Sequence, residues 1–379
     1  MDRIYIRDLK IKKVRHLENI DIPISPDEEM RHLLLTGENG SGKTSVLTAL
    51  AGFLDNATKN NNTKIEGGIE LTFNLSDAEI SQHYKNGEFI IAFYMDFRRF
   101  DPVSPKQIEK VELMDSYDII NGPRNDFLKY LLDMKMMQAM AVADGKQEDA
   151  DRIKGWFDNL TNLLKKIYGN DKLELEFDRD HYNFLISIPG REKFDFKTMS
   201  SGYAAVIDIV VDLMLRMEKQ TGRNFKYDMP GIVLIDEIET HLHLSLQKQI
   251  MKILTGIFPN IQFIVSTHSP FVLNSIDEVT IYDLENRTLV KNGLSDVPYE
   301  GVVEGYFNVN TMSDELKDKF VRYKELISKS ELTADEEVEI YSLEHDLDEI
   351  PDFLALDEST EYERMKLEYH NRRENSVNG

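Results

Sequence analysis

A glycine-rich segment early in the chain has the residue types and spacing of a phosphate-binding loop. It reads Gly37, Glu38, Asn39, Gly40, Ser41, Gly42, Lys43, Thr44 and Ser45. An apolar run at residues 32–36 precedes it, and a helical pattern at residues 45–53 follows it. Glycines in such a turn let backbone N–H groups close around phosphates at a helix N-terminus, where the macrodipole also favours negative charge. The pattern predicts that Lys43 reaches the β- and γ-phosphates of a nucleotide and that Thr44 binds Mg²⁺.

Two adjacent carboxylates further along the chain suit metal and water chemistry. An apolar run at residues 232–235 ends directly in Asp236 and Glu237. A buried parallel strand delivers the residues at its carboxyl end to the crevice where α/β sheets bind ligands. Asp236 then suits Mg²⁺, and Glu237 suits the orientation of a water that attacks a γ-phosphate. Two acids after a strand are more often an ordinary strand end, but the phosphate-binding loop in the same chain favours the functional interpretation.

Two further segments resemble motifs of ABC-class ATPases. Residues 199–203, Met-Ser-Ser-Gly-Tyr, open an apolar helical pattern and resemble the family's signature loop, Leu-Ser-Gly-Gly-Gln and its variants. The resemblance implies that Ser200 and Gly202 contact the γ-phosphate bound by the opposite subunit. His268, directly after another apolar run, resembles the switch histidine, which implies a γ-phosphate contact. Alone, these residues would be a helix cap and a solvated histidine, but the order of the motifs favours the ATPase interpretation.

The resemblance points to one branch of this class. Residues 235–243, followed by Ser-Thr-His-Ser-Pro at residues 266–270, resemble the RecF, SMC and OLD branch, with residues 239–243 at the D-loop. Those proteins are soluble ATPases tied to DNA metabolism and anti-phage defence. The long interval between Lys43 and Ser200 leaves room for extra strands and a helical lid. Transporter engines are more compact there, so a transporter is disfavoured.

The segments that the chain lacks, and three features that it has, indicate which proteins of this branch it resembles. The chain lacks the long heptad arms of SMC clamps and an acidic nuclease cluster after His268. We interpret Asp346, Asp348 and Glu349 as a solvated helix face rather than a metal site. Tyr203, the short lid and the acidic tail resemble the ATPase subunits of retron- and Septu-type anti-phage systems. That resemblance implies a separate partner nuclease, commonly of HNH type.

The hydrophobic patterns predict the elements that position these residues. Alternating polar and apolar residues indicate strands at 4–6 and 20–24, with further strands at 69–75 and 89–95 and a hairpin of 173–177 with 182–188. The stretch 126–168 has a helical pattern. In the second half, helices at 203–219 and 245–258 alternate with strands at 232–235 and 261–266. This order predicts an α/β fold, an ABC-type head with a mostly parallel core sheet and an antiparallel β subdomain. We place the head at residues 1–300, with a helical lid insertion at about 104–170, and an acidic helical extension at 301–379.

Composition excludes several function classes. The chain has 379 residues, 41% hydrophobic residues and no cysteine, so disulfides, thiolate nucleophiles and Cys-ligated zinc are excluded. It has neither an apolar stretch of membrane-spanning length nor a signal-peptide pattern, and we expect a cytoplasmic protein. The net charge of −23 argues against a surface that grips nucleic acid throughout, although a local basic patch could still contact DNA. Much of the acidity lies in residues 311–379, where 20 Asp and Glu face 9 Lys and Arg.

Two segments allow more than one interpretation. The expected Q-loop, at residues 95–99, has no glutamine. Arg98 or Arg99 could lie near the γ-phosphate or could equally be a surface residue or a partner contact. In the tail, amphipathic helices are expected, one of them begun by a capping box of Thr333 and Glu336. These helices could brace a dimer, join dimers into a ring, hold a partner or restrain a nuclease.

The sequence leaves three functional hypotheses. The leading one is a nucleotide-gated dimeric switch that binds and hydrolyses ATP with Mg²⁺ in an anti-phage defence system and controls a nuclease supplied in trans. A RecF-like DNA-repair ATPase would instead bind DNA directly at physiological salt. A nucleotide-stabilised scaffold would dimerise with little turnover. A neighbouring gene for a nuclease or a reverse transcriptase would settle the class.

Overall fold

The computed structural model describes residues 3–60, 68–98, 100–105, 107–297, 301–302, 314–329, 332–348 and 362–370. The contacts divide the chain into two compact units, Met1–Tyr299 and Glu300–Gly379. Each unit is described by itself.

A six-stranded sheet forms the centre of the first unit. Its strands are β3 (His32–Thr36), β5 (Ile90–Tyr94), β9 (Gly231–Ile235), β10 (Ile261–Ser266), β11 (Val279–Asp283) and β12 (Thr288–Lys291), in the order β12-β11-β3-β10-β9-β5. All neighbouring pairs are parallel except β11 with β12. Strands β3, β5, β9, β10 and β11 are buried along their whole length, as a sheet covered on both faces requires. The predicted α/β fold with a mostly parallel core sheet is confirmed.

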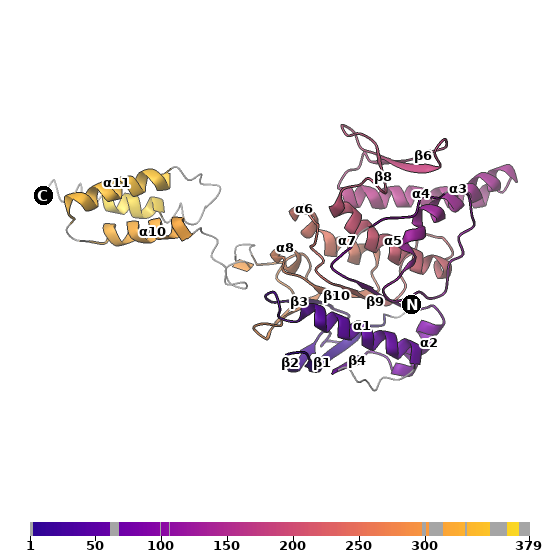
Figure 1. Ribbon diagram of the computed structural model, residues 1–379, viewed down its shortest axis with the longest axis horizontal. Helices are drawn as coiled ribbons and strands as arrows, with labels where there is room; N and C mark the ends of the chain where they lie inside the picture. The colour runs from indigo at the N-terminus through magenta and orange to yellow at the C-terminus, as the bar shows by residue number, and fades with distance from the viewer. Residues whose placement is uncertain are drawn as a thin grey trace. The chain divides into compact units, whose positions relative to one another are not determined.

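One face of this sheet is covered by α1 (Lys43–Asn60) and a second sheet (Figure 1). That sheet is antiparallel, with β1 (Ile6–Val14) between β2 (Leu17–Pro23) and β4 (Ile69–Phe73), and α2 (Asp77–Lys85) follows it. In β1, buried Leu9 and Ile11 alternate with exposed Lys10 and Lys12. This period-2 pattern places one face of the sheet against α1 and the other in solvent.

The other face is covered by α3 (Phe127–Ala143), α4 (Gln147–Tyr168), α5 (Ser201–Thr221) and α7 (Ile250–Ile257) (Figure 1). The short helix η1 (Pro123–Asp126) leads into α3. The predicted helical stretch at 126–168 is confirmed, with a break at residues 144–146, where Gly145 has a φ of 72°. The predicted hairpin is also present, as β6 (Glu174–Asp178) and β7 (Asn183–Ser187), to which β8 (Phe194–Asp195) adds.

One predicted helix is wrong in its continuity. The stretch 245–258 forms two pieces, α6 (Leu244–Gln247) and α7, interrupted at Lys248 and Gln249. The interruption follows from the backbone at Gln249, whose φ of −116° departs from helical geometry. The short helix α8 (Pro270–Leu273) follows β10.

The second unit contains α10 (Asp314–Ile327), α11 (Ala334–Asp348) and a further helical segment at residues 362–370. Its core consists of Tyr323, Leu326, Ile327, Ile340, Leu347, Tyr362, Met365 and Tyr369. The predicted capping box is confirmed, because Thr333 N donates to Glu336 Oε2 at 2.9 Å and Glu336 N to Thr333 Oγ1 at 3.3 Å. Asp346 and Asp348 pair with Lys319 and Lys366, and Glu349 lies outside the described residues. Within the described parts of both units, no helix has the length and apolarity needed to cross a membrane.

Candidate nucleotide-binding site

The parallel sheet brings the sequence motifs to one edge. Strands β3, β5, β9 and β10 run in the same direction, with Leu34 opposite Val265 and Val265 opposite Ile235. Their carboxyl ends therefore meet, and the loops that follow them share a crevice. These loops carry the phosphate loop (residues 37–44), the Asp236–Glu237 pair, His268 and Arg98.

The backbone of the phosphate loop has the conformation that its glycines allow. Gly37, Gly40 and Gly42 have φ values of 128°, 91° and 101°, a region that side chains with a Cβ rarely adopt. At Gly42 space is also limited, since a Cβ would lie 2.8 Å from Leu17 Cδ1. Helix α1 begins at Lys43, within the last two residues of this loop, and the first N–H groups of a helix have no partner within it. The loop and the helix start thus form a cradle suited to phosphate oxygens.

Lys43 lies inside this cradle. Its Nζ donates to the carbonyl oxygens of Gly37 and Glu38, both at 2.9 Å, and the residue is only 6% exposed. Burial lowers the pKa of the Lys43 ammonium, and the nearby carboxylates of Glu237 and Asp236 oppose this shift. The ammonium therefore points at the loop interior, where phosphate oxygens could replace the two carbonyls as acceptors.

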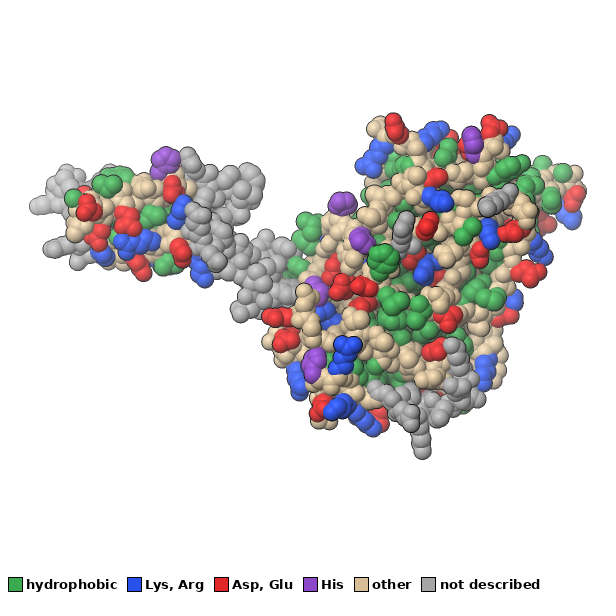
Figure 2. Space-filling view, in the orientation of Figure 1, with side chains coloured by type: hydrophobic (Ala, Val, Ile, Leu, Met, Phe, Trp, Pro, Cys, Tyr) green, Lys and Arg blue, Asp and Glu red, His purple; other side chains and the backbone are tan. Residues whose placement is uncertain are grey.

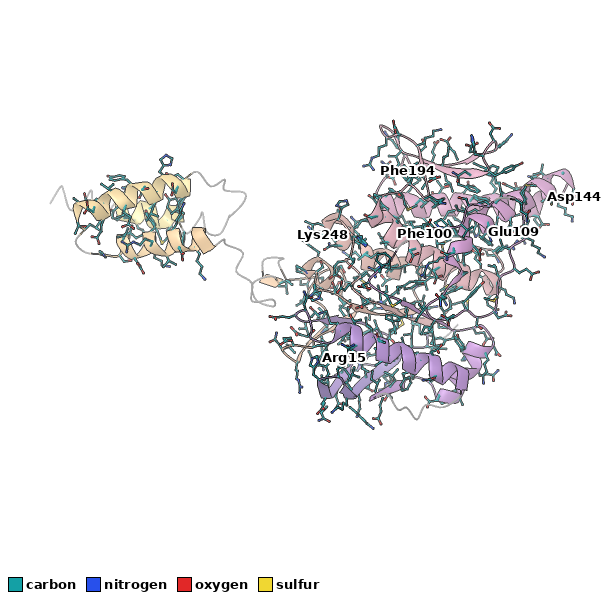
Figure 3. All side chains as sticks on the ribbon, in the orientation of Figure 1. Arg15, Phe100, Glu109, Asp144, Phe194 and Lys248 are labelled. Carbon is teal, nitrogen blue, oxygen red and sulfur yellow. The ribbon has the colours of Figure 1, made fainter. Side chains whose placement is uncertain are left out.

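A cavity of about 220 Å³ is lined by residues of three of the sequence motifs. It is lined by Arg15, His16, Asn39, Gly40, Gly42, Lys43, Thr44, Ser45, Glu237 and His268. The structure thus brings the phosphate loop, Glu237 and His268 together. Sequence reasoning missed Arg15 and His16, which lie in the turn between β1 and β2; Figure 3 shows Arg15 on the side of the head that carries α1. The positive φ of Arg15, 51°, marks this turn, but nothing in the local sequence links it to the loop.

A second and larger cavity lies elsewhere in the described part of the head. It measures about 730 Å³ and contains none of the motif residues. Arg31 and Glu278, which line it, immediately precede β3 and β11, so it lies at the opposite edge of the sheet. Its lining mixes basic and acidic side chains without a defined set of ligand contacts.

Contacts from β10 hold the Asp236–Glu237 pair. Ser266 Oγ donates to Asp236 Oδ1, and the backbone N–H of Glu237 donates to Ser266 Oγ at 2.7 Å. Glu237 has a φ of 44°, an unfavourable value for a residue with a Cβ, and its Oε2 accepts from Thr240 Oγ1 at 3.3 Å. The backbone is therefore strained where it turns Glu237 toward the cavity.

Arg98, for which the sequence left two interpretations, is buried. It is 6% exposed, and its guanidinium donates to the carbonyl oxygens of Asp236 and Glu237. It is thus neither a surface residue nor a residue that lines the cavity. Arg99 lies outside the described residues.

His268 presents a free nitrogen at the site. Its backbone N–H donates to Glu239 Oε1, whereas its side-chain Nε2 is buried and has no hydrogen-bond partner among the described residues. Burial lowers the pKa of His268, and the neighbouring Lys43 ammonium lowers it further. A buried polar atom without a partner is costly, and a ligand in the adjoining cavity would supply one.

Ser200 and Gly202 are not part of this cavity. Ser200 is the N-cap of α5, but its side chain makes no capping bond and is exposed. Gly202 packs tightly against the loop after β9, since a Cβ there would lie 2.9 Å from His241 O. Within one chain, the signature segment (residues 199–203) is therefore separate from the phosphate loop, and the prediction that it completes a partner's site stays a prediction.

The donor set fits Mg²⁺ bound together with phosphates. Exposed Thr44 lines the cavity and buried Asp236 lies beside it. No group of three or more His, Asp or Glu in the described part of the chain could hold an ion by itself. Mg²⁺ commonly binds one or two protein oxygens, with waters and substrate phosphates as the other ligands, and Thr44 with Asp236 matches that pattern.

Comparisons with known proteins show which proteins this chain resembles. The family described as "AAA domain, putative AbiEii toxin, Type IV TA system" matches residues 105–274, which contain the signature segment, Asp236, Glu237 and His268. The Septu protein PtuA of Bacillus mycoides (strain KBAB4) is 26% identical over 98% of this chain and 55% of its own length. PtuA of Bacillus thuringiensis is 24% identical over 89% of this chain and 91% of its own length. The Retron Ec83 probable ATPase of Escherichia coli is 34% identical over 36% of this chain and 26% of its own length.

The fold and the site together resemble those of ABC/SMC-like ATPases. Within that class, the chain resembles Septu PtuA and the retron ATPases. It spans about half the length of the Bacillus mycoides PtuA and about a quarter of the retron protein.

Proposed function

We propose that this protein binds and hydrolyses ATP and acts as a nucleotide-gated dimeric switch in a defence system of the Septu or retron type. The observation that carries this proposal is the cavity in which one fold gathers Lys43, Thr44, Glu237 and His268. These side chains come from three separate loops and have the charges that a nucleotide triphosphate and its hydrolysis require.

Each side chain has a definable task. Lys43 and the backbone N–H groups at the start of α1 bind the phosphates, and Lys43 exchanges its two loop carbonyls for phosphate oxygens. Thr44 and Asp236 would hold Mg²⁺, which neutralises charge on the phosphates when bound. Glu237 orients the attacking water and accepts its proton. His268 offers Nε2 to the γ-phosphate.

The signature segment supports a site shared between two chains. Exposed Ser200 lies outside the cavity of its own chain, which leaves it free to contact a phosphate held in the cavity of a second copy. Exposed apolar side chains follow the strand ends: Met95 and Phe97 after β5 are 49% and 78% exposed, and Leu244 after β9 is 59% exposed. A second copy would cover these side chains, which gives dimerisation an apolar contribution.

The defence setting rests on the relatives. Two of them are named Septu protein PtuA and one a retron probable ATPase, so we assign this chain the ATPase role in such a system. Acidic and basic side chains are interspersed on the visible face of the head (Figure 2), which gives no sign of a continuous basic surface for nucleic acid there. From the resemblance to Septu and retron ATPases, we further propose that a nuclease of HNH type is a separate partner chain, whose activity this ATPase controls.

Mixing two inactive variants tests the shared site. Ser200→Arg should bind ATP through its own Lys43 but lose turnover, because the arginine blocks the partner's nucleotide. Lys43→Ala should lose ATP binding. In mixed dimers, the intact phosphate loop of the first variant faces the intact signature segment of the second, so ATPase activity should return on mixing. Full turnover by Ser200→Arg alone, or no recovery in mixtures shown to contain mixed dimers, would contradict a shared site.

A further inference from the structure

We propose that Arg98 is a positioning residue for hydrolysis, which holds the backbone of Asp236 and Glu237 in place. The inference rests on the proposed function and adds to it a residue that fixes the position of the Glu237 carboxylate, which orients water.

The guanidinium of Arg98 holds the chain where it leaves β9. Its Nη1 donates to the carbonyl oxygens of Asp236 at 2.6 Å and Met95 at 3.2 Å. Its Nη2 donates to the carbonyl oxygens of Glu237 at 2.7 Å and Ile238 at 3.2 Å. Arginine suits this task because its planar group presents several donors in a fixed geometry, which a lysine ammonium does not.

This contact explains how Glu237 keeps a strained backbone. A positive φ at a residue with a Cβ costs on the order of 1–3 kcal/mol and persists only where the surroundings enforce it. Arg98 binds the carbonyl groups on both sides of that φ, those of Asp236 and Glu237. Without the guanidinium, the turn can relax, and the Glu237 carboxylate would leave the position from which it faces the cavity.

Asp208, on α5, is a buried carboxylate that pairs with another arginine, Arg124. The side chain is 1% exposed and forms an ion pair with Arg124 Nε at 3.2 Å. Burial raises the pKa of Asp208 to about 6, and the positive charges of Arg124 and Arg98 oppose the shift. Asp208 thus lies within electrostatic reach of two guanidinium groups, only one of which contacts the backbone of the site.

The pairing of Asp208 is incomplete. Asp208 Oδ1, Arg98 Nε and Arg124 Nη1 are all buried, and among the described residues none of them has a hydrogen-bond partner. The 3.2 Å ion pair therefore lacks good hydrogen-bond geometry. A small movement of α5 could bring these donors and this acceptor into better alignment.

One turn further along α5, the contacts are complete. Asp212 Oδ2 accepts from Tyr94 OH and from Arg216 Nε, both at 2.7 Å. Gly122 leaves room for this carboxylate, since a Cβ there would lie 1.9 Å from Asp212 Oδ1. Asp212 thus anchors α5 to β5.

The test compares Arg98→Met with Arg124→Met in the full chain. Both substitutions remove a guanidinium near Asp208, but only Arg98 contacts the backbone of Asp236 and Glu237. For each variant we would measure the ATP dissociation constant, kcat, KM and Tm. Arg98→Met should lower kcat by about 100-fold, as expected for a misplaced catalytic group, with little change in ATP affinity. Arg124→Met should keep kcat.

Three outcomes separate the possible failures. A wild-type protein without turnover would refute the proposed function itself. If the wild type is active and Arg98→Met is equally active, the positioning role alone is refuted. The same holds if Arg98→Met and Arg124→Met lose kcat in the same proportion to their loss of Tm, because the effect would then be one of stability. If Arg98→Met does not fold, Arg98→Lys replaces it: a charge that cannot span the carbonyls should still lower kcat, and normal kcat there would overturn the inference.

Discussion

The imidazole of His32 should make the head less stable in mild acid. His32 is the first residue of β3, the strand that leads into the phosphate loop, and it is only 4% exposed. The backbone N–H of Phe263 donates to its Nδ1 at 3.1 Å, so this nitrogen must be unprotonated. Burial lowers the pKa of His32 from 6.5 to about 4, with a further contribution from the positive charge of Arg3.

The direction of the effect follows from the two protonation states. Between pH 6.5 and about pH 4 the unfolded chain binds a proton at His32 and the folded chain does not, so the free energy of unfolding falls as the pH falls. The stabilisation is fully present above pH 6.5. Each tenfold difference in proton affinity is worth about 1.4 kcal/mol, so the loss from this side chain amounts to about 3 kcal/mol at pH 4.

His32→Asn tests this reasoning because an asparagine oxygen can still accept from Phe263 N–H but does not titrate. Urea unfolding followed by the fluorescence of Trp156, the only tryptophan and a buried one, reports on the head alone. Between pH 7 and pH 4.5, the wild type should lose about 2–3 kcal/mol more than the variant. His243→Asn, at an exposed position, serves as the control. Equal pH dependence of wild type and His32→Asn would refute the assignment.

Two substitutions test the site directly. Lys43→Ala should weaken ATP binding by at least about 100-fold, because the charged contacts to the phosphates are lost; calorimetry measures this, and retained affinity would remove the phosphate-loop assignment. Glu237→Gln should bind ATP with normal affinity, lose turnover and accumulate as a dimer in size-exclusion chromatography with ATP, because the carboxylate acts on water and not on phosphate. Undiminished turnover in that variant would place the catalytic base elsewhere.

The sequence by itself determined the parts of the site that depend on short segments. Gly37 to Thr44 and the Asp236–Glu237 pair could be predicted because backbone conformation, glycine placement and a strand end are local properties. Four of the six core strands, β3, β5, β9 and β10, followed from their apolar runs, and their parallel arrangement places the carboxyl ends at one edge. Strands β11 and β12 were not predicted. The helix break at Lys248 and Gln249 had no such local signal and was missed.

Only the tertiary structure decided which distant side chains complete the site. Arg98 contacts Glu237, which lies 139 residues further along the chain. In the sequence, an arginine that follows a strand has the same local pattern whether it is buried or on the surface. In the sequence, Asp208 is a polar residue in an otherwise apolar helix, and only the structure shows that it is buried beside Arg124. Arg15 and His16 reach the cavity because the β1–β2 sheet packs beside α1. Such contacts depend on how the helices and sheets pack against each other. The hydrophobic pattern of the sequence predicts which face of a helix or strand is buried, but not which side chain of another element that face contacts.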